Sequence, residues 1–515
     1  MSDARSYNLL CQPWIPVIWR DDASVPKEPK IGIREALERA HEIHRISHTS
    51  PFIEFGLYRL LITIVLDAYI VAKKRPTIGK MRQMLQAGRL DPCVINGYLD
   101  AHKQGFELWG KGERFLQAGA ANSTADPVAK MVSPIPSGTK ITHWHHYSAA
   151  ETTLNESEAA LELCAVTPFC FDYAPADICT LAGDPPLYVI VQGESLFQTI
   201  VLNLPRPSGR TIQQAERDLG PLWRTAVADT TAVPSSPTIC QGWTWPVRKL
   251  RLTNTDKGLI STAVNTSGAG KTEARKRVRS WRDPNAGTIT KADGLSHIRG
   301  KEGMVLCRDL LPIFLIGSEG EALKGERRRS RPEVVSNALR ASDDQRLNLA
   351  LYGFIDKGGQ NNKVFRTWMR SAFSFPAEVA RDERLSYKAL GAFKSAQKVA
   401  DALKVALRML RPMINAVPRE RKNLRNTQRG ETDALAGFWQ RLEPALARTY
   451  LDDLSEGKAD AMKNLKRVLR SEARNAFKAA AAPHRRDADG LFRIANASNY
   501  LERRLARLLP KEKNR

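Results

Sequence analysis

The most apolar stretch of the chain is residues 52–72, FIEFGLYRLLITIVLDAYIVA, and it also contains Glu54, Arg59 and Asp67. A run of this length could span a bilayer, but membrane helices rarely tolerate three charged side chains. We therefore expect a helix that is buried inside a domain, most regular from Arg59 to Val71, and no contact with a membrane.

Length and charge set the broad class. A chain of 515 residues predicts two to four domains at ~150 residues each, and a hydrophobic content of 42% is enough for real cores. The 79 Lys and Arg residues exceed the 55 Asp and Glu residues, which gives a net charge of +24. Such a balance indicates a polyanionic partner, most often nucleic acid, but phosphate attraction carries no sequence preference.

The cysteines indicate reduced thiols. An odd number of them is scattered without a CxxC pair, and no signal peptide opens the chain, so we expect a cytoplasmic protein without a zinc knuckle or a structural disulfide. The seven positions are Cys11, Cys93, Cys164, Cys170, Cys179, Cys240 and Cys307.

Periodicity predicts a mixture of strands and helices before Pro376. Asn155 and Glu158 have the spacing of a capping box at the start of a helix through Cys164. The apolar run 304–316, broken by Arg308 and Asp309, suggests a buried strand with a bend. Further strands are expected at 13–17, 31–33, 187–191 and 259–264, and further helices at 34–46, 79–88 and from Leu196.

Beyond Pro376 strand signals disappear and helical periodicity dominates. We expect an α+β fold, in which residues 1–376 form a large mixed domain and residues 377–515 form a C-terminal four-helix bundle. The second segment has 31 Lys and Arg against 17 Asp and Glu, a net charge of +14. Its helices are predicted at 387–410, 433–454, 459–481 and 491–509.

A second notable stretch is residues 351–370, LYGFIDKGGQNNKVFRTWMR. Glycine allows a main chain to approach a ligand closely, and amide side chains can donate to and accept from base edges. Val364, Phe365 and Trp368 then recur at helical spacing, which predicts a basic helix start. The alternative is a plain polar turn between a strand and a helix. The candidate DNA-binding residues here are Gly358, Gly359, Gln360, Asn361, Asn362 and Lys363.

Residues 265–272, NTSGAGKT, resemble a phosphate-binding loop that would use Lys271 and Thr272. The motif requires glycine where Asn265 stands, and no apolar run ends in paired carboxylates. A flexible loop is the better interpretation. Two alternative functions are kept, a nucleic-acid-stimulated ATPase and a non-specific basic scaffold for nucleic acid. No catalytic triad or paired acid and base stands out, so we expect no enzymatic activity and no cofactor.

The next segment is strongly basic and ends beside an aromatic residue, Trp281. Such a cluster suits DNA phosphates and an exposed base, and it equally suits a solvated basic face, so both interpretations stay open. The residues concerned are Arg275, Lys276, Arg277 and Arg279.

Two histidine groups have spacings that invite a metal hypothesis. His41, His44 and His48 would share one face of the predicted helix 34–46, whereas the other group lies at 143–146. The first group has no carboxylate or cysteine at a matching distance, and we expect no metal site at either group.

Several short motifs occur in an order that resembles the CasA-type large subunits of the type I-E CRISPR Cascade complex. The resemblance covers most of residues 7–370, and it also implies a C-terminal helical bundle. The motifs are Asn8-Leu9-Leu10, Trp14-Ile15-Pro16-Val17, Arg34-Glu35-Ala36-Leu37, Arg114-Phe115-Leu116-Gln117, Trp144-His145-His146, Asn155 with Glu158-Ala159-Ala160, Leu196-Phe197-Gln198-Thr199, and Gln360 or Asn361 with Lys363 and Trp368.

The resemblance implies a non-catalytic subunit that recognises a short protospacer-adjacent motif from the minor groove, aids duplex opening and R-loop formation, and recruits a helicase–nuclease. The implied partners are double-stranded target DNA, crRNA, and the backbone, small and guide-end subunits. Trp144, His145 and His146 would contact guide RNA or another subunit. The sequence departs from the family where a glycine-dense loop is usual, because residues 171–186 contain only Gly183.

Overall fold

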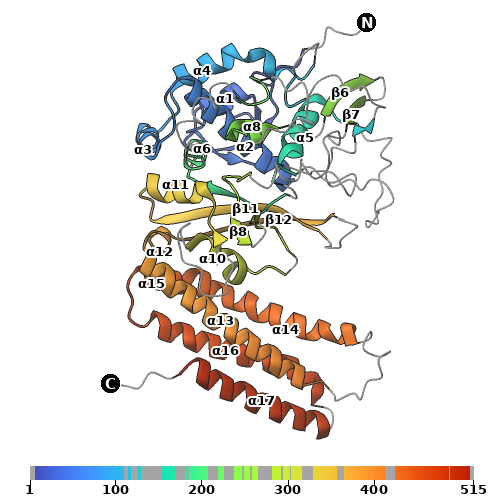
Figure 1. Ribbon diagram of the computed structural model, residues 1–515, viewed down its shortest axis with the longest axis vertical. Helices are drawn as coiled ribbons and strands as arrows, with labels where there is room; N and C mark the ends of the chain where they lie inside the picture. Colours follow the sequence, from blue (N-terminus) through green and yellow to red (C-terminus); the bar gives the residue numbers. More distant parts are fainter. Residues whose placement is uncertain are drawn as a thin grey trace. The chain divides into compact units, whose positions relative to one another are not determined.

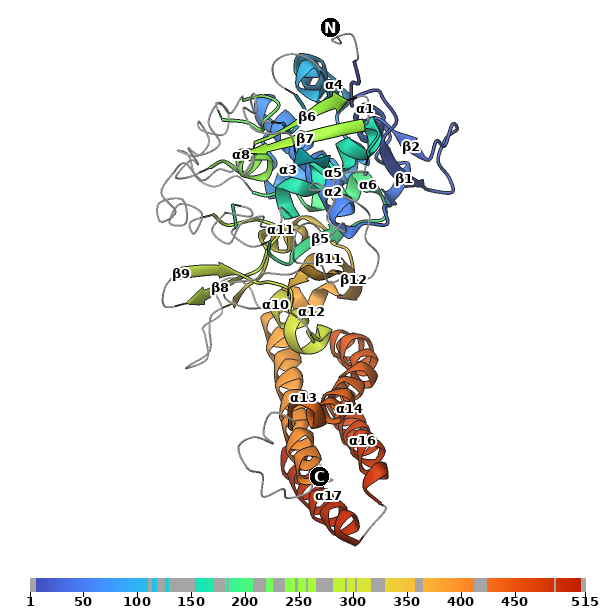
Figure 2. The ribbon, with the colours of Figure 1, turned by 90° about the vertical axis from the view of Figure 1, so that its right-hand side faces the viewer.

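The chain forms two compact units in a computed structural model (Figures 1 and 2). The mixed unit comprises residues 1–302, 321–343 and 348–373, and the helical unit comprises 303–320, 344–347 and 374–515. The structure describes residues 6–109, 114–117, 126–128, 153–169, 181–182, 185–206, 219–225, 237–245, 249–255, 258–264, 281–291, 294–301, 303–315, 329–356, 365–411, 424–485 and 488–510.

The mixed unit is built around helix α2, Pro51–Val71. Every residue from Pro51 to Ile70 is buried, so the predicted buried helix is confirmed. Its closest neighbour is α5, Glu156–Phe169 (Figure 1). Gly56 permits this approach, because a Cβ atom there would lie 2.4 Å from the carbonyl oxygen of Cys164.

Smaller helices surround α2, and two of them confirm predicted helices, at 79–88 and after Ser195. Ser195 caps the latter by accepting a hydrogen bond from the amide of Gln198. The helices are α1 (Ile33–Glu38), α3 (Ile78–Ala87), α4 (Pro92–Ala101), α6 (Leu196–Leu202), α8 (Ile239–Thr244), α11 (Glu333–Ala341) and the 3-10 helix η1 (Lys103–Phe106).

Among the residues that the structure describes, the strands form four three-stranded sheets, and the strand pairs with a described register are antiparallel. In sheet order they are β2 (Lys30–Ile31), β1 (Ile15–Trp19) and β3 (Ile43–Ile46); β12 (Phe365–Pro376), β11 (Arg346–Asp356) and β5 (Tyr188–Gln192); β4 (Asp126–Pro127), β7 (Gly258–Val264) and β6 (Lys249–Thr255); and β10 (Arg329–Ser330), β8 (Thr288–Lys291) and β9 (Gly294–His297).

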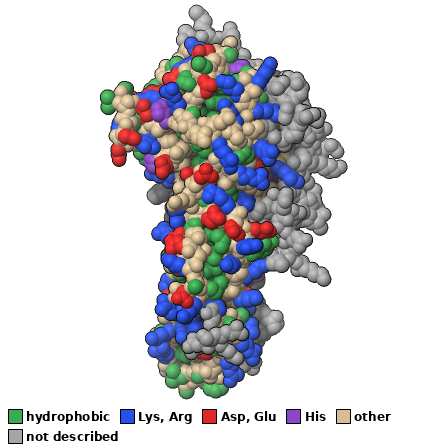
Figure 3. All heavy atoms as spheres, turned by 90° about the vertical axis from the view of Figure 1, so that its left-hand side faces the viewer, with side chains coloured by type: hydrophobic (Ala, Val, Ile, Leu, Met, Phe, Trp, Pro, Cys, Tyr) green, Lys and Arg blue, Asp and Glu red, His purple; other side chains and the backbone are tan. Residues whose placement is uncertain are grey.

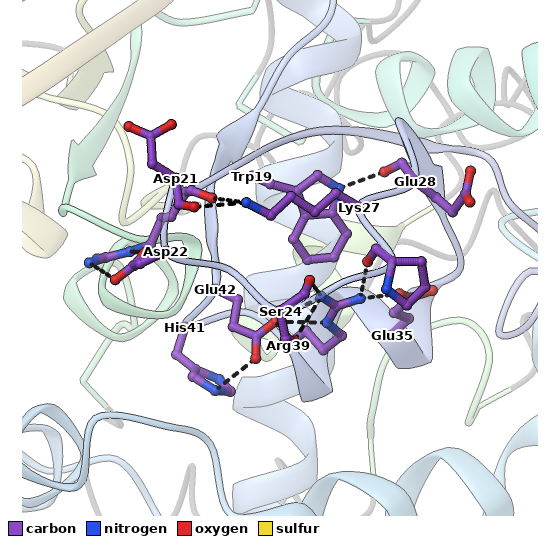
Figure 4. A network of polar contacts seen from close by, with 12 residues as sticks. Trp19, Asp21, Asp22, Ser24, Lys27, Glu28, Glu35, Arg39, His41 and Glu42 are labelled. Atoms are coloured by element: carbon purple, nitrogen blue, oxygen red, sulfur yellow. Dashed lines mark hydrogen bonds and ion pairs between the residues drawn. The ribbon is translucent and has the colours of Figure 1, made fainter.

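A polar network centred on Arg39 holds the loop between β1 and β2 (Figure 4). The guanidinium lies over the Trp19 ring, 4.1 Å from its centroid, and donates to the carboxylates of Glu35 and Glu42. It also donates to the carbonyl oxygens of Ser24 and Pro26. Stacking and charge-assisted hydrogen bonds together fix this loop against the turn after α1.

The helical unit consists almost entirely of helices, as its periodicity predicts. The four expected long helices are α13, α14, α16 and α17, which Figure 2 shows in the helical part of the chain. The described elements are η3 (a π-helix, Leu306–Leu310), α10 (Leu311–Leu315), α12 (Ala377–Arg381), α13 (Glu383–Met409), α14 (Leu424–Pro444), η5 (a π-helix, Ala445–Tyr450), α15 (Leu451–Ser455), α16 (Ala461–Ala481), η6 (Ala482–His484) and α17 (Ala488–Leu508).

The predicted strand at 304–316 is wrong, because this run forms the helices η3 and α10. Arg308 and Asp309 do not interrupt it. They form an ion pair on the partly exposed side, while Cys307, Leu310 and Phe314 are buried at helical spacing.

Two predicted helices are partly or wholly strands. Residues 34–46 begin as α1 but end as β3. Ile43 and Ile46 are buried where β3 pairs with β1, so their spacing of three, which is typical of a helix, arises here in a strand. The predicted helix start after Lys363 is wrong as well. Residues 365–376 form β12, since pairing with β11 overrides the local pattern.

No helix in the described part of the chain combines the length and the apolar character required to cross a membrane. For α2 the reason is the one expected from its three charges.

Candidate nucleic-acid interface

All candidate site residues predicted from sequence lie outside the described residues. They are Gly358, Gly359, Gln360, Asn361, Asn362, Lys363, Arg275, Lys276, Arg277, Arg279, Gly183, Trp144, His145 and His146. The structure nevertheless describes the residues that flank three of these segments. The flanking residues make contacts with α2, and two of the three charged side chains of this helix, Glu54 and Arg59, take part in those contacts.

Glu54 binds both strands that flank residues 357–364. Its Oε1 accepts a hydrogen bond from the hydroxyl of Tyr352 on β11 at 2.7 Å and one from Nη2 of Arg370 on β12 at 2.9 Å. Glu54 is fully buried, and this burial raises the pKa of its carboxyl, although the hydrogen bond from Tyr352 and the charge of Arg370 oppose the shift. One carboxylate therefore contacts both β11 and β12, the two strands between which the segment with the glycine and amide residues lies in the sequence.

Aromatic rings on the same turn of α2 contact the flanks of a second segment. The Phe52 ring packs on Phe169, the last residue of α5, with 4.4 Å between centroids. Phe55 stacks on Tyr188, the first residue of β5, at 4.5 Å. Phe52 also meets Trp368 of β12 edge to face. Residues that flank the Gly183 segment and residues that flank 357–364 thus contact neighbouring positions of one helix.

Arg59, one turn further along α2, anchors the flank of the third segment. Its guanidinium bonds both carboxylate oxygens of Asp283, at 2.9 and 3.1 Å, and lies over the Tyr188 ring. Asp283 also accepts a hydrogen bond from the backbone amide of Asn285. The Arg59 and Asp283 side chains are only 6% and 2% exposed. Asp283, which follows the basic segment in sequence, is therefore held in the core beside α2.

Trp281 does not have the exposed position expected of a base-stacking residue. It is only 7% exposed, and its ring occupies the space that a Cβ atom would need at Gly242. The interpretation in which Trp281 stacks on a base is therefore disfavoured, because the side chain is part of the core. The neighbouring Arg282 is exposed, while the four basic candidates before it stay a prediction.

The third charge of α2, Asp67, is equally well paired. It accepts hydrogen bonds from Nε and Nη2 of Arg224 at 2.8 and 2.9 Å and from the hydroxyl of Tyr98 at 2.6 Å. Burial, followed by the nearby charge of Asp67, raises the pKa of Tyr98 well above its ordinary value. This network links α2 to α4 and to Arg224.

In the sequence, the three charges of α2 exclude a membrane span but do not indicate their partners. Their partners lie 316, 224 and 157 residues away, so no local pattern identifies them. The usable signal was the charge itself: a carboxylate or guanidinium inside a buried helix requires a partner from elsewhere in the chain.

The described surroundings of Lys271 and Thr272 do not match a phosphate-binding loop. Both residues lie outside the described part of the chain, but the strand before them is β7. That strand pairs antiparallel with β4 on one side and β6 on the other. A phosphate-binding loop follows a strand of a parallel βαβ unit, so this context disfavours the ATPase alternative.

The helical arrangement expected for His41, His44 and His48 is wrong, because they follow α1, lie in β3 and follow β3, respectively. His44 instead approaches the carbonyl oxygen of Glu194. Within the described ranges, no three His, Cys, Asp or Glu side chains are grouped as a metal ion would need. Figure 3 shows Lys and Arg side chains spread over the visible surface, in keeping with the positive charge of the sequence.

The fold is shared with solved structures. The chain aligns with the structure of CasA (Cse1) from Thermus thermophilus with a TM-score of 0.73 and 20% identity, over 97% of this chain and 99% of that one. It aligns with a chain from a CRISPR RNA-guided surveillance complex with a TM-score of 0.68 and 17% identity, over 98% and 99% of the two chains.

Sequence comparison then places the chain in a family. The curated CRISPR-associated protein CasA/Cse1 of Thermus thermophilus is 26% identical over 278 residues, which is 50% of this chain and 51% of that relative. The match thus spans about half the length of the curated relative. Residues 8–476 match the family model for CRISPR-associated protein Cse1. The chain belongs to the Cse1 family.

Proposed function

We propose that this chain is the large subunit of a CRISPR RNA-guided surveillance complex and that it recognises a short motif flanking the target in duplex DNA. Family membership and the fold shared with a chain of such a complex support the assignment. In this mechanism guide RNA reads the long target by base pairing, while the protein reads only the short flank. The chain then has no catalytic step of its own.

The observation that carries the proposal is the convergence on α2. Contacts of Glu54, Phe55 and Arg59 lead to the flanks of three candidate segments, which are far apart in sequence. A rigid support of this kind suits recognition, because residues that read base edges must be held in register. Amides and glycines suit the minor groove, whose degenerate pattern accepts several related flanks.

The basic residues have a different role in this proposal. Lys363 and the cluster from Arg275 to Arg279 hold phosphates, which positions the duplex without selecting a sequence. Duplex opening and recruitment of a helicase–nuclease follow recognition. The partners are target DNA, guide RNA and the other subunits of the complex.

The test is target binding by the assembled complex, measured on duplexes that differ only in the flank. The triple variant Gln360→Ala, Asn361→Ala, Lys363→Ala should lose discrimination between flanks. Each base-directed contact contributes ~1–3 kcal/mol. A matched control is Lys80→Ala with Gln83→Ala on α3, where Gln83 is exposed and Lys80 is partly exposed. Unchanged flank discrimination in the triple variant would refute the proposal.

A further inference from the structure

A groove of about 980 Å³ lies within the helical unit, between α13, α14 and η3. Its apolar lining, here called the floor, includes Met304, Val305 and Leu435, which are partly exposed, and Trp439, which is buried. Ala436 also lines the groove, and its short side chain is exposed. The guanidinium of Arg308 lies over the Trp439 ring, 5.8 Å from its centroid.

The rim of the groove is cationic. Lys404 and Arg408 project from successive turns of α13, and both are exposed. Neither lies within ion-pair distance of a carboxylate among the described residues, whereas Arg308 is neutralised by Asp309 at 2.7 Å. Arg408 complements the C-terminal dipole of α13, which ends at Met409. Lys404 is more than one turn from that end and gains little from the dipole.

Two further features distinguish the groove from a simple phosphate site. The carboxylates of Asp401 and Glu443 line it too, and burial raises the pKa of Glu443. In addition, Oε1 of Gln397 is buried without a hydrogen-bond donor among the described residues, although its amide nitrogen donates to Asp401. A phosphodiester strand carries a charge at every nucleotide and would make no use of the apolar floor, whereas a protein segment can place its few carboxylates opposite Lys404 and Arg408 and away from Asp401 and Glu443.

We propose that this groove binds an acidic amphipathic segment of a partner protein. Its apolar side chains cover the floor, its carboxylates pair with Lys404 and Arg408, and an N–H group satisfies Gln397. This is the arrangement in which an amphipathic helix lies in a groove, with anchors at helical spacing. Charge complementarity at the rim then selects the partner.

The test is photocrosslinking in cells. The full chain carries p-benzoylphenylalanine in place of Ala436 and is co-expressed with the genes that neighbour its own. We expect a crosslink to another protein, mapped by mass spectrometry to a peptide that is net acidic and apolar at helical spacing. The double variant Lys404→Glu, Arg408→Glu should lower the crosslink yield at least tenfold.

Matched controls separate this contact from general attraction. Lys388→Glu with Lys398→Glu makes the same charge change on exposed positions of α13 outside the groove and should leave the yield within twofold. Crosslinks to nucleic acid, to this chain itself, or no crosslink above that seen with the probe at Lys398 would overturn the proposal. So would an equal loss in the control double variant. Co-purification of guide RNA is scored separately, so failure of the proposed function is distinguishable.

Discussion

Helices α2 and α13 show two ways of determining which parts of a chain come together. Helix α2 is buried on all sides, and each of its three charged residues is paired with a residue far away in the sequence. Helix α13 buries only one face, rich in alanine, and keeps most of its charges in solvent. In the mixed unit buried charges select the partners, whereas in the helical unit apolar periodicity does.

The ion pairs of the two units differ accordingly. Arg59 and Asp283 are almost completely buried in the mixed unit, whereas Arg474 and Glu502 in the helical unit are 53% and 43% exposed. Removing one partner of a buried pair leaves an unpaired charge in a medium of low polarity. Removing one partner of an exposed pair leaves a charge that water solvates. Similar substitutions should therefore have very different consequences.

The largest effect is expected for Arg59→Met. Loss of the guanidinium leaves Asp283 buried and unpaired, which should lower the free energy of unfolding of the mixed unit by about 3–5 kcal/mol. Urea denaturation provides the measurement, and hydrogen exchange of the α2 amides localises it. The double variant Arg59→Met, Asp283→Leu should recover much of the loss, because no buried charge remains. A loss below about 1 kcal/mol in the single variant would contradict the argument.

Glu54→Gln tests whether the buried carboxylate also positions strands β11 and β12. The amide keeps one hydrogen bond but loses its charge, so the free energy of unfolding should fall by about 1–3 kcal/mol. Flank discrimination by the assembled complex should weaken although residues 358–363 are intact. A double-mutant cycle with Arg370→Met isolates the pair, and additive effects of the two substitutions would show that they do not act together.

The long helices of the helical unit were largely predictable from sequence, because apolar residues recur in them at helical spacing. Helices α13, α16 and α17 were expected within a few residues of their ends, whereas the predicted helix 433–454 covers only the second part of α14 and continues through η5 and α15. The start of α5 was equally visible. Asn155 Oδ1 accepts from the amide of Glu158, and Glu158 Oε2 accepts from the amide of Asn155, both at 2.9 Å. Such signals work because the interacting groups are close in sequence.

The candidate site was less predictable for the opposite reason. Residues 365–370 carry a helical pattern, yet they form a strand because β11 pairs with them. Trp281 follows a basic run like a surface aromatic, yet it fills the space beside Gly242. Both outcomes depend on tertiary contacts, which local patterns do not encode. The candidate segments themselves stay a prediction, and no sequence pattern indicated that the residues flanking them contact α2.

Glu162 differs from the paired charges of α2. It is a buried carboxyl of the mixed unit, and among the described residues no cation offsets the effect of its burial on the pKa. Burial, and then the nearby Glu158, raises its pKa to about 8. The folded state thus holds the proton more tightly than the unfolded state, so stability should fall as pH rises from the ordinary carboxyl range toward 8. The expected slope is about 1 kcal/mol for each pH unit.

Denaturation curves between pH 5 and 9 measure this dependence, in buffers spaced by about one unit. Glu162→Gln should remove the slope and be more stable than the wild type at the alkaline end, since the amide has no charge to bury. An unchanged slope in this variant would assign the pH dependence to other groups.

The smallest effect is expected for Arg474→Ala in the helical unit. Arg474 donates two hydrogen bonds to Glu502, at 2.6 and 2.7 Å, and thereby links α16 to α17. Both side chains are largely in solvent, so water replaces the lost partner and the free energy of unfolding should change by only ~0.2–1 kcal/mol. Raising the salt concentration should reduce even this difference. A loss comparable to that of Arg59→Met would mean that charge pairing also determines the helical unit, and the distinction between α2 and α13 would fail.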